Sequence, residues 1–301
     1  MSVTKNDILQ PGSGRRGFTL IEVLVSIGMI SLLVGILLPA LGRARDIGRG
    51  AACAASLHQA GVALACYLDD NEGAFFPYFQ DVPSPGGGRR WWFGFEKGGP
   101  AMNPNQRNRS LDKAAGFLGK YMGGSWRDFV CPAFPYEASG YFRKFGNPAG
   151  GYGYNTEALA GFGSPTEPVV RPRKIQEFAG RTSDVFALAD GIHFDRLTLS
   201  GSPPMKQGFN EPPYIQWQSE TVFNTTAGVN GGYGHFRHAG RANVLYLDGH
   251  AGGQLLKGSA HPFTIKGLGA VGNLSDELGR KRDVVRSPGA QSVRIDVVYG
   301  L

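Results

Sequence analysis

Aspartate and histidine residues with the chemistry of metal ligands stand beside two similar apolar segments of this chain. The segments are residues 184–189 and 243–247, and each runs directly into an Asp-Gly dipeptide. The candidate ligands around them are Asp190, His193, His238, Asp248 and His250. Carboxylates and imidazoles together suit zinc or another divalent ion, and calcium prefers oxygen ligands. If the two segments are neighbouring strands, both aspartates lie at strand ends, and the side chains converge on a structural calcium or zinc site.

The same residues also have a purely structural interpretation. Asp-Gly favours the positive backbone angles of a tight hairpin turn, so each aspartate can cap its own turn. His238 would then hydrogen-bond to Asp248 and lock the hairpin. The sequence has no nucleophile elbow, HExxH pattern or phosphate loop, the motifs that most directly indicate an enzyme. We therefore expect a non-catalytic protein, with a metal-dependent hydrolase as an alternative.

The chain has three cysteines, too few for a disulfide framework. Cys53 and Cys66 fall on one predicted helix, about 20 Å apart, which is beyond the reach of a disulfide. Either of them can pair with Cys131 in an oxidising compartment. Otherwise the cysteines act as small buried apolar groups.

An apolar segment occupies residues 18–41 and contains a single charged residue, Glu22. The uncharged stretch from Val23 to Leu41 would be about 29 Å long as a helix, close to the thickness of the hydrocarbon layer of a bilayer. The segment is therefore predicted to cross a membrane once. A carboxylate inside such a segment is costly and requires a partner or a functional reason.

The start of this segment resembles the class III signal of type IV pilins and of type II secretion pseudopilins. The resemblance rests on Gly17, Phe18, Thr19, Glu22 and Pro39 in their order and spacing. It implies that a prepilin peptidase removes residues 1–17 by cutting between Gly17 and Phe18, and then methylates the new amine of Phe18. The apolar helix stays in the product and becomes its assembly element.

The resemblance also gives Glu22 a role, because the cut creates a cationic amine at Phe18. Glu22 of one chain would neutralise the amine of its neighbour and set the register of the assembly. The alternative is that Glu22 complements the positive end of its own helix. Implied partners are the lipid bilayer, other pilin or pseudopilin subunits in a homo- or heteropolymer, a secretion platform protein and an ATPase.

Charge does not orient the predicted span, because basic residues flank it on both sides. They are Lys5, Arg15 and Arg16 before it and Arg43, Arg45 and Arg49 after it. The resemblance does orient it, as a single-pass protein of the inner membrane. The leader lies in the cytoplasm, and the head is periplasmic or extracellular.

A second helical pattern follows, over residues 42–70, and ends in the polar stretch 69–73. Its apolar stripe is Ile47, Ala51, Ala54, Leu57, Gly61, Leu64 and Leu68. Pro39 and the glycines after it predict a kink or partial melting of the helix near the membrane surface.

The remainder, residues 71–301, is expected to form the head. Glycine accounts for 46 of the 301 residues, which indicates many turns and long ordered loops, especially over residues 74–181. Trp91 and Trp92 are expected to pack in a core against the long helix, with a sugar platform or a subunit contact as alternatives. The net charge of +7 is scattered, with one tight basic cluster at residues 280–282, so nucleic acid is not the expected partner.

Nine residues separate His238 from Asp248-Gly249, and this spacing resembles the prepilin-type processing-associated H-X9-DG domain. The corresponding segment is 238–249, and a final strand is predicted at residues 292–299. The expected fold is α+β and pilin-like, with a long N-terminal helix packed on an antiparallel sheet. The expected function is that of a structural subunit of a type II secretion or type IV pilus-like filament. A membrane-tethered module that binds glycan or DNA is the other alternative.

Overall fold

The computed structural model describes residues 17–83, 86–98, 108–123, 129–138, 141–160, 172–195, 208–212, 214–215, 231–255 and 270–272. The chain forms two compact units, Met1–Arg45 and Asp46–Leu301, and each is described separately below. Residues 1–16 of the predicted leader, the basic cluster at 280–282 and the strand predicted for 292–299 lie outside the described residues.

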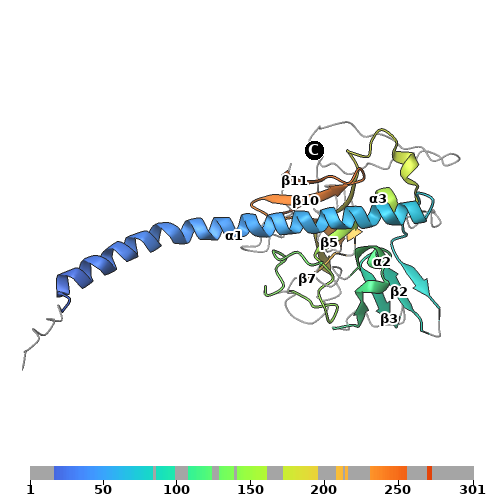
Figure 1. Ribbon diagram of the computed structural model, residues 1–301. Coiled ribbons are helices and arrows are strands. Elements are labelled where there is room, and N and C mark those ends of the chain that lie inside the picture. Colours follow the sequence, from blue (N-terminus) through green and yellow to red (C-terminus); the bar gives the residue numbers. More distant parts are fainter. Residues whose placement is uncertain are drawn as a thin grey trace, which may run out of the picture. The chain divides into compact units, whose positions relative to one another are not determined.

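Helix α1, Leu20–Asp70, begins in the first unit and ends in the second (Figure 1). It contains Pro39, and its helical conformation continues on both sides of this proline. The partial melting expected there is therefore wrong; a proline removes one hydrogen bond of a helix without necessarily ending it. At its C-terminus the amide of Gly73 donates to the carbonyl of Leu68 at 2.7 Å, and Gly73 takes a φ of +76°. Glycine adopts this left-handed conformation without strain.

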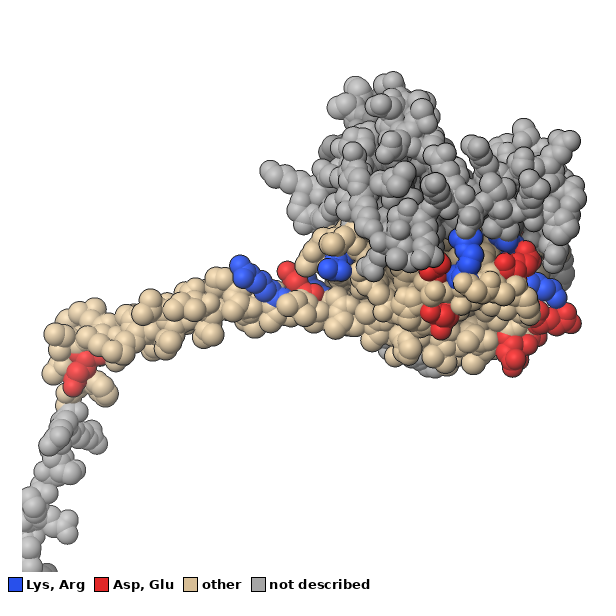
Figure 2. Space-filling view, turned by 90° about the horizontal axis from the view of Figure 1, so that it is seen from above, with Lys and Arg blue, Asp and Glu red and all other residues tan. Residues whose placement is uncertain are grey.

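In the first unit, the described residues of α1 are exposed along their whole length. Among the described residues, α1 is the one helix long and apolar enough to cross a membrane. Figure 2 shows the uncharged surface of this part of the helix in tan. Water is a poor solvent for so continuous an apolar surface.

In the second unit, one face of α1 is buried in the head. The buried residues are Cys53, Leu57, Ala60, Gly61, Ala63, Leu64 and Leu68. They recur at the three- and four-residue spacing of a helix face. The predicted stripe is confirmed from Leu57 onward, whereas Ile47 and Ala51 at its start are exposed. The head contacts α1 from about Gly50 onward and buries the side chains of this face fully from Cys53.

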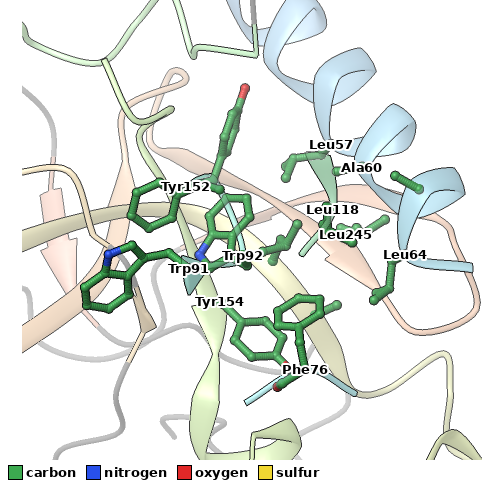
Figure 3. Close-up of a cluster of buried hydrophobic side chains, with 14 of the residues drawn as sticks. Leu57, Ala60, Leu64, Phe76, Trp91, Trp92, Leu118, Tyr152, Tyr154 and Leu245 are labelled. Carbon is green, nitrogen blue, oxygen red and sulfur yellow. The ribbon is translucent and has the colours of Figure 1, made fainter. Parts of the chain in front are cut away.

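A small antiparallel sheet has the strand order β1-β2-β3-β4. Its strands are β1 Gln80–Val82, β2 Gly88–Trp91, β3 Gly94–Lys97 and β4 Leu111–Asp112. The short helices η2 Lys113–Ala115 and α2 Gly119–Met122 follow it. Trp91 and Trp92, at the end of β2, are 4% and 1% exposed and belong to the core that includes Leu57 and Leu64 of α1 (Figure 3). The core interpretation is confirmed, and the sugar platform is wrong for these two buried rings.

The larger sheet has the main strand order β11-β10-β6-β5-β8, with β7 and β9 also paired to β6 and β12 paired to β9. Its strands are β5 Tyr152–Asn155, β6 Phe186–Asp195, β7 Gly208–Asn210, β8 Tyr214–Ile215, β9 Gly231–Phe236, β10 Arg241–Tyr246, β11 Ala251–Leu255 and β12 Ala270–Gly272. The helices α3 Thr156–Leu159 and η4 Ile175–Phe178 lie between β5 and β6 in the sequence. The pairings between these strands are antiparallel except that of β5 with β8.

Strand β10 is buried on both faces. Leu245 belongs to the same core as the buried face of α1. Ala242, Val244 and Tyr246 belong to a second apolar cluster together with Phe186 and Phe236. Successive side chains of a strand point to opposite faces, so β10 separates the two clusters. The long helix and the antiparallel sheets together make the fold α+β and pilin-like, as predicted.

Candidate functional site

The N-terminal signal begins just before α1. Gly17 and Phe18 are exposed and precede the first helical residue. The backbone N and Oγ1 of Thr19 both donate to Oε2 of Glu22 at 2.8 Å, and the backbone N of Glu22 donates back to Thr19 Oγ1 at 3.3 Å. A threonine followed three residues later by a glutamate in these contacts is a capping box. In a single chain, therefore, Glu22 stabilises the start of its own helix.

The two Asp-Gly dipeptides differ in structure. Asp248-Gly249 forms the turn between β10 and β11, with Gly249 at a φ of +90°. Asp190-Gly191 lies in the middle of β6, where Gly191 pairs with Gly234 of β9. The turn predicted at Asp190 is therefore wrong, because pairing to β9 continues the strand through it.

The predicted convergence of all the metal-ligand candidates is also wrong. Strands β6 and β10 are neighbours, as expected, but they are antiparallel, with Leu188 opposite Leu245. When two neighbouring strands are antiparallel, the residues at their C-terminal ends lie at opposite ends of the strand pair. Asp190 and Asp248 are therefore separated by the length of their paired strands.

At the turn, Asp248 Oδ1 accepts from the backbone N of His250 at 3.1 Å and lies 2.6 Å from its Nδ1. This part of the structural interpretation is confirmed, because Asp248 caps its own turn. His193 lies further along β6, opposite Asn210 of β7, and burial, with a smaller effect of Lys144, lowers its pKa to about 3.

Asp190 and His238 do come together, in the interior of the second unit. Asp190 is fully buried, and its Oδ1 lies 2.5 Å from Nη2 of Arg237. Its Oδ2 lies 3.2 Å from Nε2 of His238 and accepts from the backbone N of Asn243 at 2.7 Å. The predicted bond from His238 to Asp248 is thus replaced by one to Asp190. A buried carboxylate is tolerated when it is paired and hydrogen-bonded in this way.

A disulfide joins Cys53 of α1 to Cys131, with a Cα–Cα distance of 5.2 Å, and Cys66 is an exposed free thiol. Nε2 of His238 lies 3.6 Å from Sγ of Cys131, and Nε of Arg237 lies 3.2 Å from it. Among the described residues, Cys53, Cys131, Asp190 and His238 form the one group able to hold a metal ion, with ligand atoms all within 4.8 Å of one another.

Segment 238–249 contacts α1 at two places, one toward each end of the segment. A Cβ added to Gly50 would lie 3.5 Å from Nδ1 of His238, and the Gly50 carbonyl accepts from Nδ2 of Asn243 at 3.1 Å. A Cβ added to Gly61 would lie 2.8 Å from Cδ1 of Leu245 and 3.6 Å from the carbonyl of Gly249. Two glycines of α1 therefore provide the close approach between helix and hairpin.

Sequence reasoning missed Arg237 and the two glycines. Arg237 directly precedes His238, and by composition alone it belongs with the scattered basic residues. Its guanidinium is buried and also donates to the carbonyls of Gly151 at 2.7 Å and Gly191 at 3.1 Å. Its position next to the histidine was the one available signal. Gly61 lay on the predicted apolar stripe and Gly50 did not, and nothing in the sequence indicated that either glycine permits a close contact.

The family model for the prokaryotic N-terminal methylation motif matches residues 12–38. The matched stretch contains Gly17, Phe18 and Glu22 and most of the apolar segment. It supports a type IV pilin-like protein with one N-terminal apolar helix. No curated protein and no solved structure matches the chain.

Proposed function

We propose that the chain is a pseudopilin-like, non-catalytic subunit of a type II secretion or type IV pilus-like filament. The observation that carries this proposal is a methylation motif placed directly on an exposed apolar helix. Each 100 Å² of apolar surface kept from water is worth about 2.5 kcal/mol, so this helix favours lipid first and the helices of other subunits later. The same surface thus serves as membrane anchor and as polymer core.

Processing by a prepilin peptidase would cut between Gly17 and Phe18. This proposal is supported by the exposure of both residues and by their position ahead of the first helical turn. A peptidase needs an extended, accessible backbone, and residues before a helix supply it. The leader would be cytoplasmic, the helix would span the inner membrane, and the head would be periplasmic or extracellular.

Assembly would bring Glu22 of one chain to the methylated amine of Phe18 in a neighbour. A carboxylate has about four lone-pair sites, and those of Glu22 are not exhausted by the two bonds from Thr19. The capping contacts would therefore orient the carboxylate while it receives a second cation. A platform protein and an ATPase would supply the force for assembly, as for the proteins that this N-terminus resembles.

We propose further that segment 238–249 is an H-X9-DG segment whose role is to hold α1 in the head. Support comes from the contacts of His238 and Asn243 with Gly50 and of Leu245 with Gly61. The disulfide adds a covalent link between the same helix and the head at Cys131. Forces that act on the helix in a filament would be transmitted to the head through these contacts.

The processing proposal is tested by intact mass and N-terminal sequencing of the protein extracted from membranes of a host with a prepilin peptidase. The expected product begins at an N-methylated Phe18, and Gly17→Val is expected to keep its leader. An intact Met1 in the parent, or a start beyond residue 40, would contradict the proposal.

The two roles of Glu22 are separated by matched variants in an assembly assay, with recovery in cross-linked multimers as the readout. Glu22→Ala is expected to assemble poorly, because it removes the charge. Thr19→Val removes the capping hydroxyl and keeps the charge, so it is expected to assemble. Ser26→Ala, which removes only a bond to the Glu22 carbonyl, is the control. Equal recovery of Glu22→Ala and the parent would refute a role for the carboxylate in stacking.

A further inference from the structure

The disulfide has unusual surroundings. Cys53 lies on α1, Cys131 lies in the described segment 129–138, Asp190 lies on β6, and His238 lies between β9 and β10. All are buried, and each presents one ligand atom within 4.8 Å of the others. A disulfide requires neither a carboxylate nor an imidazole beside it, and burying these groups is costly. We propose that, once the disulfide is reduced, Cys53, Cys131, Asp190 and His238 bind one zinc ion.

The ligand set and two of its separations fit zinc. Zinc prefers four ligands from cysteine, histidine and carboxylate, and tetrahedral bonds of about 2.0–2.3 Å place ligand atoms roughly 3.3–3.8 Å apart. Nε2 of His238 is 3.2 Å from Oδ2 of Asp190 and 3.6 Å from Sγ of Cys131. These separations are already close to those of a tetrahedral site. The two sulfur atoms must move apart, and breaking the bond between them permits this.

Charge balance also favours zinc over a bare reduced site. In the disulfide form, the negative Asp190 is neutralised by Arg237. In the zinc form, two thiolates and Asp190 contribute three negative charges, and zinc and Arg237 contribute three positive ones. In both forms the charges of these buried residues and of the metal therefore sum to zero, which avoids the penalty for an unpaired buried charge.

Two of the four ligands, Cys131 and Asp190, already have the contacts of an outer shell. Nε of Arg237 lies 3.2 Å from Sγ of Cys131, so it can donate to a zinc-bound thiolate. Nη2 of Arg237 and the backbone N of Asn243 hold the two oxygens of Asp190. Outer-shell contacts of this kind orient the ligands of metal sites and raise affinity.

The change between the two forms is balanced by a phosphine reductant. The phosphine takes the oxygen atom of one water molecule and becomes a phosphine oxide; the two electrons and two protons released break the bond between Cys53 and Cys131 and yield two thiols. Zinc then displaces both thiol protons into solvent. His238 binds through Nε2 as the neutral ring, with its proton on Nδ1. The same four segments are thus joined by a covalent bond in one form and by a metal in the other.

The experiment uses the full chain in detergent with Cys66→Ser, so that the exposed free thiol cannot bind metal. The protein is unfolded and refolded either with a phosphine reductant and equimolar zinc or under oxidising conditions. Zinc per chain is measured after gel filtration, and cobalt substitution reports thiolate ligation by its absorption spectrum. The expected result is one zinc per chain after reduction and none in the oxidised protein.

Matched variants assign the ligands. His238→Gln and Cys53→Ser are expected to weaken zinc binding by at least about tenfold, whereas His250→Gln, which changes an exposed histidine outside the group, is expected to leave it unchanged. The proposal is overturned if the reduced protein takes up no zinc or fails to refold with zinc. It is also overturned if His238→Gln binds zinc as tightly as the parent, or if the oxidised protein binds equally well.

Discussion

The contact between Gly61 of α1 and Leu245 of β10 gives the sharpest test of how the helix is held. A Cβ at residue 61 would lie 2.8 Å from Cδ1 of Leu245, closer than carbon atoms normally pack. Leu245 is fully buried, so its side chain has little room to yield. Overpacking of this kind destabilises a core by about 1–3 kcal/mol.

A second effect has the opposite sign, because alanine is favoured over glycine inside a helix by about 0.8–1.0 kcal/mol. Gly48 isolates this effect: it lies on α1 in the same unit, and nothing lies within 4 Å of a Cβ added there. Gly48→Ala is therefore expected to stabilise the head by up to about 1 kcal/mol. Gly61→Ala is expected to be neutral or to destabilise it by up to about 2 kcal/mol.

The assay is denaturant unfolding of the head, followed by fluorescence of the buried Trp91 and Trp92. A double-mutant cycle with Leu245→Ala completes the assay. Leu245→Ala alone should destabilise the head by about 2–5 kcal/mol. The methyl group that Gly61→Ala adds should then fit the space left by the truncated leucine. The two changes should therefore be less destabilising together than the sum of their separate effects. If Gly61→Ala stabilises the head as much as Gly48→Ala does, the contact does not constrain the helix and the reasoning is refuted.

Three further predictions concern the interior of the head. Asp190→Asn should lower the free energy of unfolding by about 3–5 kcal/mol, because it leaves the buried guanidinium of Arg237 without its carboxylate partner. Asp248→Asn should lower it by less than about 1 kcal/mol, because the contact of Asp248 with His250 is exposed; equal losses would contradict this. Cys131→Ser should cost up to about 4 kcal/mol, because the disulfide closes a loop of 78 residues, whereas Cys66→Ser should change little. His193 is held neutral with a pKa of about 3, below its unfolded value, so its contribution to stability is present above about pH 6.5 and is lost as the pH falls toward 3. The parent should thus lose more stability between pH 7 and pH 4.5 than His193→Asn does, and parallel pH profiles would contradict this assignment.

Features that depend on local pattern were predictable. The helical spacing of Leu57, Leu64 and Leu68 fixed the face of α1 that packs in the head, and the buried tryptophans followed from the size of their rings. The methylation motif is a continuous stretch of sequence, so it needs no knowledge of the fold. A disulfide between Cys131 and a cysteine of the helix was one of two open alternatives; the structure shows it with Cys53, a choice over Cys66 that spacing could not make.

Features that depend on strand direction were not predictable. The two Asp-Gly dipeptides look equivalent in the sequence, yet one forms a turn and the other lies inside a paired strand. The strand continues through Asp190-Gly191 because it pairs with β9, which lies some forty residues further along the chain. The antiparallel pairing of β6 and β10 then separates Asp190 from Asp248, and a residue-type pattern contains no information about that direction.

The nine-residue spacing between His238 and Asp248 has a physical reason in this fold. Gly50 and Gly61 are eleven residues apart, about 17 Å along a helix, and the six residues of β10 extend about 20 Å. The strand is thus long enough to bring one end of the segment to each glycine. Asn243 and Leu245 contact α1 from the same face of β10, and Val244 between them packs in the opposite cluster. Because side chains alternate along a strand, one residue more or fewer would turn this face away from the helix, so the alternation as well as the length constrains the spacing.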